Sequence, residues 1–294
     1  MQERTLQELL QDGRIDRQLL WAEPYNELHE WVRIWRYALV QQMAMRRFDQ
    51  SPVLSQLKDT ISDYIRTSDS YTKSLRKLAE DSVKAIVRQL PEWKTWARHI
   101  PGVGEFSFGK LLGLIGNPAA RHLFSSLSRH CGVAPINGKI EKPQKGHHRP
   151  YNSLAKSQLY LVVKQVILAY PKIPNLYGEF YYLSKQSFEH KHPDWTKMHI
   201  HLSSILRTAR LFLSHLWEVC RRTQNLPVRE PYPIEYGGHV IKIPAEMALH
   251  PFKRRDDVVR AIESVADLLM TEKDEFVREE MQELVARMRN IVQP

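Results

Sequence analysis

Two stretches near the start of the chain repeat apolar residues at spacings of three and four, and this spacing constrains the fold more than any other feature. The stretches are residues 25–48 and residues 54–90. The repeat places apolar side chains on one face of an α-helix. Pro24, Pro52 and Pro91 bound the two stretches, and proline begins or ends a helix more readily than it continues one. We therefore predict two long helices, preceded by a shorter helix over residues 5–20.

The second stretch has a heptad repeat in which Ser68 occupies one of the expected apolar positions. The apolar members of the repeat are Leu57, Ile61, Tyr64, Tyr71, Leu75 and Leu78. A long apolar stripe needs a covering partner. Two arrangements provide one: an antiparallel pair of core helices within one chain, or a coiled coil between chains. We expect self-association into a homo-oligomer, with a contribution from an apolar repeat over residues 277–291.

Composition excludes several protein classes. A chain of 294 residues with 43% hydrophobic and 26% charged residues builds one large or two modest cores, which rules out disorder. No run of eighteen apolar residues occurs, and the first residues lack the apolar core of a signal peptide, so we expect a soluble cytoplasmic protein without a membrane partner. Cys131 and Cys220 lie in no metal-ligand spacing, and we expect no metal and no cofactor.

The excess of positive charge lies in the middle of the chain. Residues 96–244 contain 20 Lys and Arg residues and only 8 Asp and Glu residues, whereas residues 1–95 contain 15 and 14. Residues 245–294 lean acidic. A polyanion is the natural partner of the central segment, and nucleic acid is the commonest polyanion in cells. We therefore expect a nucleoid-associated protein that binds DNA.

Glycine and proline punctuate residues 96–135, which indicates three short helices. Residues 135–151 have no apolar period and are expected to form an exposed loop. Three apolar helices should follow, over residues 154–169, 176–186 and 199–220. A short strand is expected at residues 239–243, and two acidic helices should end the chain.

The sequence Ile100-Pro101-Gly102-Val103-Gly104 lies between two helical patterns, as in a helix-hairpin-helix. Glycines allow positive φ angles and a close approach, so hairpin amides and the next helix N-terminus can contact one phosphate. Such a contact reads the backbone of the nucleic acid and not its sequence. An ordinary tight turn is the alternative. The expected nucleic-acid contacts, including basic residues of the loop and of the flanking helices, are Gly102, Val103, Gly104, Lys110, Lys139, Lys142, Lys145, His147, His148, Arg149 and Lys156.

The order of these motifs resembles the C-terminal domain of insertion sequence 110 family transposases, the group that includes the Piv-like DNA invertases. The resemblance covers residues 53–222 and rests on the hairpin in HIPGVGEFSFGKLLGLIGNP, on the Gly132-Val133-Ala134-Pro135 step, and on the long helix after the loop. It implies transposition or site-specific inversion of DNA by an oligomer that can be guided by a structured RNA.

Two features depart from that family. The family has a nuclease-like domain with four carboxylates before the coil, whereas residues 1–52 are short and helical. The family also has a nucleophilic serine in the loop, yet residues 135–151 contain no serine or threonine. Ser153 is the candidate nucleophile nearest to the end of the loop, although a serine or asparagine at the start of a helix is more often an N-cap.

We therefore predict a mostly α-helical protein with a helical coil, a helix-hairpin-helix DNA-binding domain and a C-terminal helical tail. The expected divisions are residues 1–52, 53–95, 96–244 and 245–294. The expected function is DNA binding in transposition or recombination. The alternative is a catalytically silent accessory or regulatory protein that binds DNA or structured RNA. A hydroxyl nucleophile near the loop is the feature that distinguishes the two.

Overall fold

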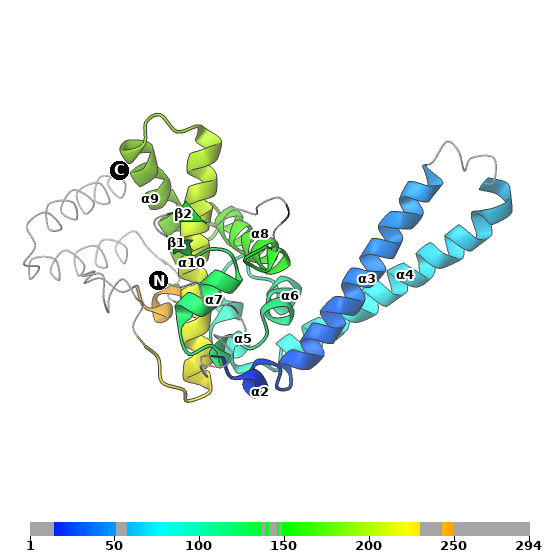
Figure 1. The fold of residues 1–294 in the computed structure, drawn as a ribbon, viewed down its shortest axis with the longest axis horizontal. Coiled ribbons are helices and arrows are strands. Elements are labelled where there is room, and N and C mark those ends of the chain that lie inside the picture. The colour runs from blue at the N-terminus through cyan, green and yellow to red at the C-terminus, as the bar shows by residue number, and fades with distance from the viewer. Residues whose placement is uncertain are drawn as a thin grey trace, which may run out of the picture.

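The computed structural model describes residues 15–50, 58–136, 139–140, 146, 149–229 and 243–249. The protein is mostly α-helical, as predicted. Figure 1 shows a long helical hairpin beside a cluster of other helices. We call the hairpin the arm; it comprises α3 (Tyr25–Asp49) and α4 (Lys58–Val87). We call residues 91–229 with residues 243–249 the body.

The body has short helices before the basic loop and long helices after it. Its elements in chain order are α5 (Pro91–Thr95), η2 (Ala97–His99), α6 (Glu105–Ile115), η3 (Pro118–Ala120), α7 (Phe124–His130), β1 (Pro135–Ile136), β2 (Lys139–Ile140), α8 (Ser153–Ala169), α9 (Leu176–Lys191), α10 (Lys197–Thr223) and η4 (Ala245–Leu249). Within the described part of the chain, none of these helices combines the length and the apolar composition that crossing a membrane requires.

Only the end of the helix expected over residues 5–20 can be compared with the structure. Residues 1–14 lie outside the described residues, and α2 runs only from Arg17 to Leu20. The Asp16 carboxylate accepts a hydrogen bond from the Leu19 amide at 3.0 Å and so caps the helix. Ile15, just before the cap, pairs with Arg121 in an isolated β-bridge. The start of α2 is therefore set by a side-chain cap and a contact with the body.

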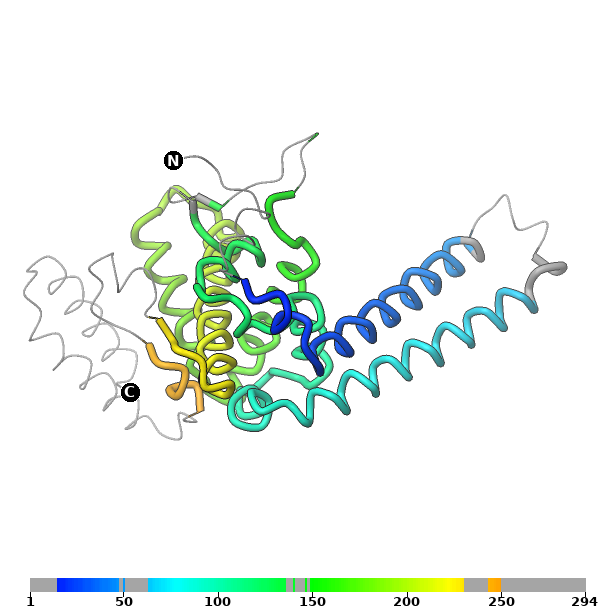
Figure 2. Tube along the Cα trace, turned by 60° about the horizontal axis from the view of Figure 1, so that its bottom comes forward, coloured from blue at the N-terminus to red at the C-terminus, as the bar shows by residue number. Residues whose placement is uncertain are grey.

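The two long helices of the arm were predicted correctly, and they pack against each other within one chain (Figures 1 and 2). The face of α4 that is buried is not the heptad stripe. Tyr64, Tyr71 and Leu78 are 70%, 68% and 54% exposed, whereas Ala79 and Val83 are fully buried. The stripe next to the heptad faces α3, and part of the heptad stripe stays exposed.

Polar contacts join the two helices along the middle of the arm. Gln42 on α3 is only 3% exposed, and its amide nitrogen donates to the Asp69 carboxylate at 3.3 Å. Its amide oxygen accepts a hydrogen bond from Arg76 at 2.6 Å. A buried amide that has both partners avoids the cost of an unsatisfied polar group. This part of the arm is therefore joined by directional bonds as well as by apolar packing.

The base of the arm docks on α6 through two glycines. A Cβ atom at Gly109 would lie 2.4 Å from a methyl of Val83, and one at Gly113 would lie 2.9 Å from the Leu28 carbonyl oxygen. The absence of side chains on this face lets α3 and α4 approach the backbone of α6 closely. Leu28 is fully buried there. The arm is thus anchored to the body by close helix contact.

The core of the body surrounds α10, which contacts α5, α7, α8, α9 and both 3-10 segments η3 and η4 (Figure 2). Phe212, Leu213 and Leu216 on this helix are fully buried. Phe212 packs against Trp96 and Tyr177, with ring centroids 5.4 and 5.3 Å apart. The three helices expected after the loop are confirmed, although α9 continues to Lys191 and α10 begins at Lys197.

Three smaller expectations concern the loop over residues 135–151, the strand over residues 239–243 and the C-terminal tail. The loop expected over residues 135–151 contains two short strands, in which Pro135 pairs with Ile140 and Ile136 with Lys139. At the expected strand over residues 239–243, only Ile243 is described, and it is not in a strand. Of the predicted C-terminal tail, only η4 is described, and residues 250–294, which contain the apolar repeat, lie outside the described residues.

Candidate nucleic-acid interface

The expected hairpin forms a turn between η2 and α6. The Val103 amide donates to the Ile100 carbonyl at 3.1 Å, and Gly104 is the N-cap residue of α6. Val103 is buried, whereas Gly102 and Gly104 are exposed. The helical segments before the turn, α5 and η2, are only five and three residues long. The turn and the helix after it were predicted; DNA contact by this turn stays a prediction.

The two exposed glycines have different surroundings. Gly102 has a φ of +89°, and a Cβ atom there would lie 2.5 Å from the Gln165 carbonyl oxygen on α8. Its missing side chain therefore allows a close approach between the turn and α8. At Gly104 a Cβ atom would meet only the Ser107 hydroxyl, at 3.5 Å. Gly104 thus leaves open space at the N-terminus of α6.

A carboxylate lies at that N-terminus. Glu105, the first residue of α6, accepts two hydrogen bonds from Arg88 at 2.7 and 2.8 Å. A negative charge in the first turn interacts favourably with the helix dipole. Arg88 balances the charge of Glu105, because the guanidinium binds both carboxylate oxygens. A phosphate bound at the turn would therefore lie beside a carboxylate whose charge is already balanced by Arg88.

Lys110 and Lys156, both expected to contact nucleic acid, lie over aromatic rings. The Lys110 amine is 4.5 Å from the ring centroid of Trp35 and 4.8 Å from that of Phe106, which places it where α6 meets α3. The Lys156 amine is 4.4 Å from the Tyr151 ring. Burial lowers the pKa of both lysines. These two amines are therefore less accessible than the exposed basic side chains.

Most of the basic loop lies outside the described residues, including Lys142, Lys145, His147 and His148. The backbone of Lys139 belongs to β2. Arg149, at the end of the loop, is exposed. Contacts from these loop residues to nucleic acid stay predictions.

The residues just after the loop begin α8. The Asn152 side-chain oxygen accepts hydrogen bonds from the amides of Leu154 and Ala155, both at 3.1 Å, so Asn152 is the N-cap. Ser153 is the first residue of the helix and is partly buried. Its carbonyl accepts a hydrogen bond from the Ser157 hydroxyl at 2.9 Å. Among the described residues, no side chain is hydrogen-bonded to the Ser153 hydroxyl.

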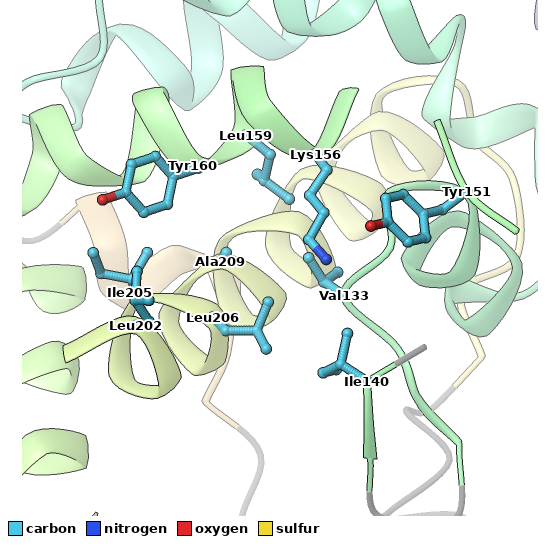
Figure 3. Close-up of a pocket in the computed structure, with 10 residues that line it drawn as sticks. All are labelled: Val133, Ile140, Tyr151, Lys156, Leu159, Tyr160, Leu202, Ile205, Leu206 and Ala209. Atoms are coloured by element: carbon cyan, nitrogen blue, oxygen red, sulfur yellow. The ribbon is translucent and has the colours of Figure 1, made fainter. Parts of the chain in front are cut away.

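An apolar pocket of about 440 Å³ lies between α8, α10 and β2. Figure 3 shows Lys156 reaching toward Tyr151 at one end of the lining residues, with Tyr160 at the other end. Ala209, Leu206 and other apolar side chains form the rest of the wall. This pocket was not predicted from the sequence, because its two main walls, on α8 and α10, lie more than forty residues apart in the chain.

Acidic and basic side chains of the segment 96–244 differ in their surroundings. Four of its acidic residues contact a side chain within the protein: Glu105 contacts Arg88, Glu179 contacts Tyr170, Glu189 contacts Lys185, and Glu218 contacts Arg222. The exposed basic residues on the same part of the chain include Arg98, Arg149, Lys164, Lys172, Lys197 and Arg207. The outer surface of the body is therefore enriched in positive charge.

Two of these exposed cations belong to segments that adjoin the turn. Arg98 belongs to η2, directly before the turn. Lys164 is next in sequence to Gln165, whose carbonyl faces Gly102. Both side chains are exposed. Buried arginines contribute nothing to this surface: Arg221 is 4% exposed and donates to the Ala119 carbonyl at 2.7 Å.

Comparisons with models of known protein families, with curated protein sequences and with solved structures find no match to this chain.

Proposed function

We propose that this chain binds DNA through its body, as a component of DNA transposition or site-specific recombination. The observation that carries the proposal is the difference between basic and acidic residues in the described part of residues 96–244. Many of the basic side chains are exposed, whereas most of the acidic side chains have a partner within the protein. Such a surface attracts a polyanion, and each phosphate contact releases counterions.

The glycine turn offers a place for one phosphate. Gly104 is exposed and opens onto free space at the start of α6, where backbone amides have no partner within the helix. Arg98 and Lys164 supply positive charge beside it. These groups contact only the nucleic-acid backbone, so we expect little sequence preference.

The assignment to transposition or recombination comes from the resemblance of the hairpin and the Gly132–Pro135 step to insertion sequence 110 transposases. The same resemblance suggests a structured RNA as a further partner. These two points are separate from the binding itself, which depends on the charge of the body. A binding test can therefore succeed whether or not the chain takes part in recombination.

The test is the salt dependence of binding to a 20-base-pair duplex. Changing Lys139, Lys142, Lys145 and Arg149 together to alanine removes up to four phosphate contacts, so the slope of log affinity against log salt should flatten by about 3 to 4. A matched control changes four exposed arm residues to alanine: Arg33, Arg66, Lys73 and Lys77. The control should keep the wild-type slope. No duplex binding by the wild-type chain would refute the proposal.

A second candidate function is that of an accessory protein that binds DNA without cutting it. The environment of Ser153 favours it, because among the described residues no side chain is hydrogen-bonded to this hydroxyl to activate it. Incubation with a nicked duplex distinguishes the two candidates. A covalent protein–DNA adduct that Ser153→Ala abolishes would support a recombinase, whereas binding without any adduct would support the accessory function.

A further inference from the structure

Four rings stack on one another where α9 turns into α10. They are Phe188, His192, Trp195 and His199, at sequence spacings of four, three and four. The Trp195 ring centroid lies 4.0 Å from His192 and 4.0 Å from His199, with interplanar angles of only 8° and 6°. Phe188 lies 5.8 Å from Trp195 at 28°. We call these four residues the ring stack.

The turn between the two helices holds the ring stack in place. The His192 amide donates to the Phe188 carbonyl at 2.9 Å at the end of α9. The Thr196 hydroxyl accepts a hydrogen bond from the His199 amide at 3.2 Å and caps α10. The rings are thus carried by two helix ends whose backbone positions are fixed, so their parallel arrangement is preorganised.

Unlike the aromatic pairs of the core, the ring stack reaches the surface. His199 is exposed, and neither His192 nor Trp195 is buried. The neighbouring Met198 is 64% exposed. By contrast, Trp96 is buried and meets Phe212 at a tilt of 41°. Parallel rings at close distance on a surface present flat aromatic faces, which is the geometry in which side chains stack on nucleobases.

Positive charge surrounds the ring stack. Residues 185–210 contain five basic and two acidic residues. Lys191 and Lys197 are exposed on the two sides of the turn. The Arg207 guanidinium lies 5.9 Å from the Phe188 ring centroid, as in a cation–π contact. Of the two acidic residues, Glu189 lies 3.8 Å from the Lys185 amine, and Asp194 is exposed in the turn.

We propose that the ring stack is a binding site for unpaired nucleobases of single-stranded nucleic acid, with Lys191 and Lys197 contacting the adjoining phosphates. A base pair within a duplex has both faces covered by its neighbours, so only an unpaired base can add to the stack. Every base has an aromatic face, and the site therefore tolerates different sequences. This inference rests on the proposed function only in taking nucleic acid as the partner. It adds a second site, which binds single strands.

The test compares three fluorescein-labelled ligands by anisotropy: a 20-nucleotide thymidine strand, an abasic strand of the same length and charge, and a 20-base-pair duplex. The wild-type protein should bind the thymidine strand about 5- to 150-fold more tightly than the abasic strand, which is the effect of stacking one base. Trp195→Ala and His199→Ala should lose most of this difference. Their duplex affinities should stay within about twofold of wild type.

The control is His122→Ala, which removes an exposed histidine from the same basic segment outside the ring stack. This variant should keep the full preference for the thymidine strand. Because His199 is exposed, its replacement tests the site even if Trp195→Ala destabilises the fold. A uridine RNA of equal length tests whether the site distinguishes RNA from DNA. We expect the protein to bind both strands, because the contact is with the base.

Two results would overturn the proposal: equal affinity of the wild-type protein for the thymidine and abasic strands, or an unchanged preference in both ring-stack variants. Neither result bears on duplex binding. Conversely, a protein that prefers the thymidine strand but does not bind the duplex would refute the proposed function and retain the ring stack as a site.

Discussion

The arm and the body cover their apolar surfaces in different ways. In the body, contacts join distant parts of the chain: the Trp96 indole donates to the Ala245 carbonyl at 3.2 Å, and Arg221 donates to the carbonyl of Ala119. In the arm, α3 and α4 cover each other, and away from the base the contacts are mainly between these two neighbouring helices. Tyr71 and Tyr37 remain 68% and 63% exposed. The body builds its core from distant segments of the chain, whereas the arm buries apolar side chains mainly between two neighbouring helices and leaves aromatic rings at its surface.

Charge follows the same division. Residues 1–95, which include the arm, are nearly balanced, whereas residues 96–244 have more than twice as many basic as acidic residues. A balanced surface with exposed aromatic rings suits contact with another protein, and a basic surface suits a polyanion. We therefore expect the arm to mediate self-association and the body to bind nucleic acid. The predictions below test this division, beginning with the largest expected effect on stability.

Truncating a ring should destabilise the body far more than the arm. Phe212 is fully buried, so Phe212→Ala should lower the free energy of unfolding by about 3 to 5 kcal/mol. Tyr71→Ala on the arm should change it by no more than about 0.5 kcal/mol, because the ring is exposed. Urea unfolding followed by circular dichroism measures both. Equal losses in the two variants would contradict the described difference in packing.

A titratable group in the body should make stability depend on pH. Burial, with a smaller contribution from the charge of Arg121, lowers the pKa of His130 to about 4. The unfolded chain binds a proton near pH 6.5, whereas the folded chain does not until near pH 4. The stabilisation is therefore complete above pH 6.5 and is lost as the pH falls toward 4, by about 2 kcal/mol between pH 7 and pH 5.

His130→Gln removes this group, so the decrease in stability between pH 7 and pH 5 should be smaller in the variant by about that amount. His122→Gln, which alters an exposed histidine, is the matched control and should keep the wild-type pH dependence. Urea unfolding at the two pH values gives the comparison. If His130→Gln were as sensitive to acid as the wild type, His130 would not be a neutral buried group.

The two glycines of the turn should differ in their tolerance of a side chain. Gly102→Ala combines a positive φ with a clash against the Gln165 carbonyl, and should cost about 2 kcal/mol. Gly104→Ala meets open space and should cost only about 0.5 kcal/mol, as expected for an N-cap. Thermal unfolding measures both. Equal costs would mean that the turn does not pack on α8 as described.

The smallest effect on stability is expected for the exposed stripe of the arm. Replacing Tyr64, Tyr71 and Leu78 together with serine should hardly change the unfolding of the monomer, since all three side chains are exposed. The same change should abolish self-association. Light scattering should give a mass above 34.6 kDa for the wild-type chain and the monomer mass for the variant. A monomer mass for the wild type at every concentration would contradict self-association through the stripe.

Local signals predicted the helices well. Asn152 and Pro91 mark the starts of α8 and α5, because a cap and a proline act on their own helix end. The periodicity of the arm predicted two helices but not their contact face. The heptad stripe and the stripe beside it both have helical spacing, and only the approach of α3 decides which one is buried.

The site was less predictable, since it depends on contacts between distant segments. Arg221 lies near the C-terminal end of α10, where its place in the sequence suggests an exposed charge that interacts with the helix dipole, yet it is buried against a carbonyl 102 residues away in the chain. The close approach allowed by Gly102 was expected toward a phosphate, and in the structure it is toward α8. The ring stack did have a signal, because its four aromatic residues follow helical spacing. The break at Pro193 concealed that the spacing continues across two helices.

The most direct test of the division between arm and body is the acetylation of individual lysines, measured by mass spectrometry with and without a duplex. Lys94 and Lys164 on the body and Lys73 and Lys77 on the arm are all exposed, so each pair is a reference for the other. The duplex should slow the acetylation of Lys94 and Lys164 several-fold and leave Lys73 and Lys77 unchanged. Protection of the arm lysines alone, or equal protection of both pairs, would contradict the assignment of nucleic-acid binding to the body.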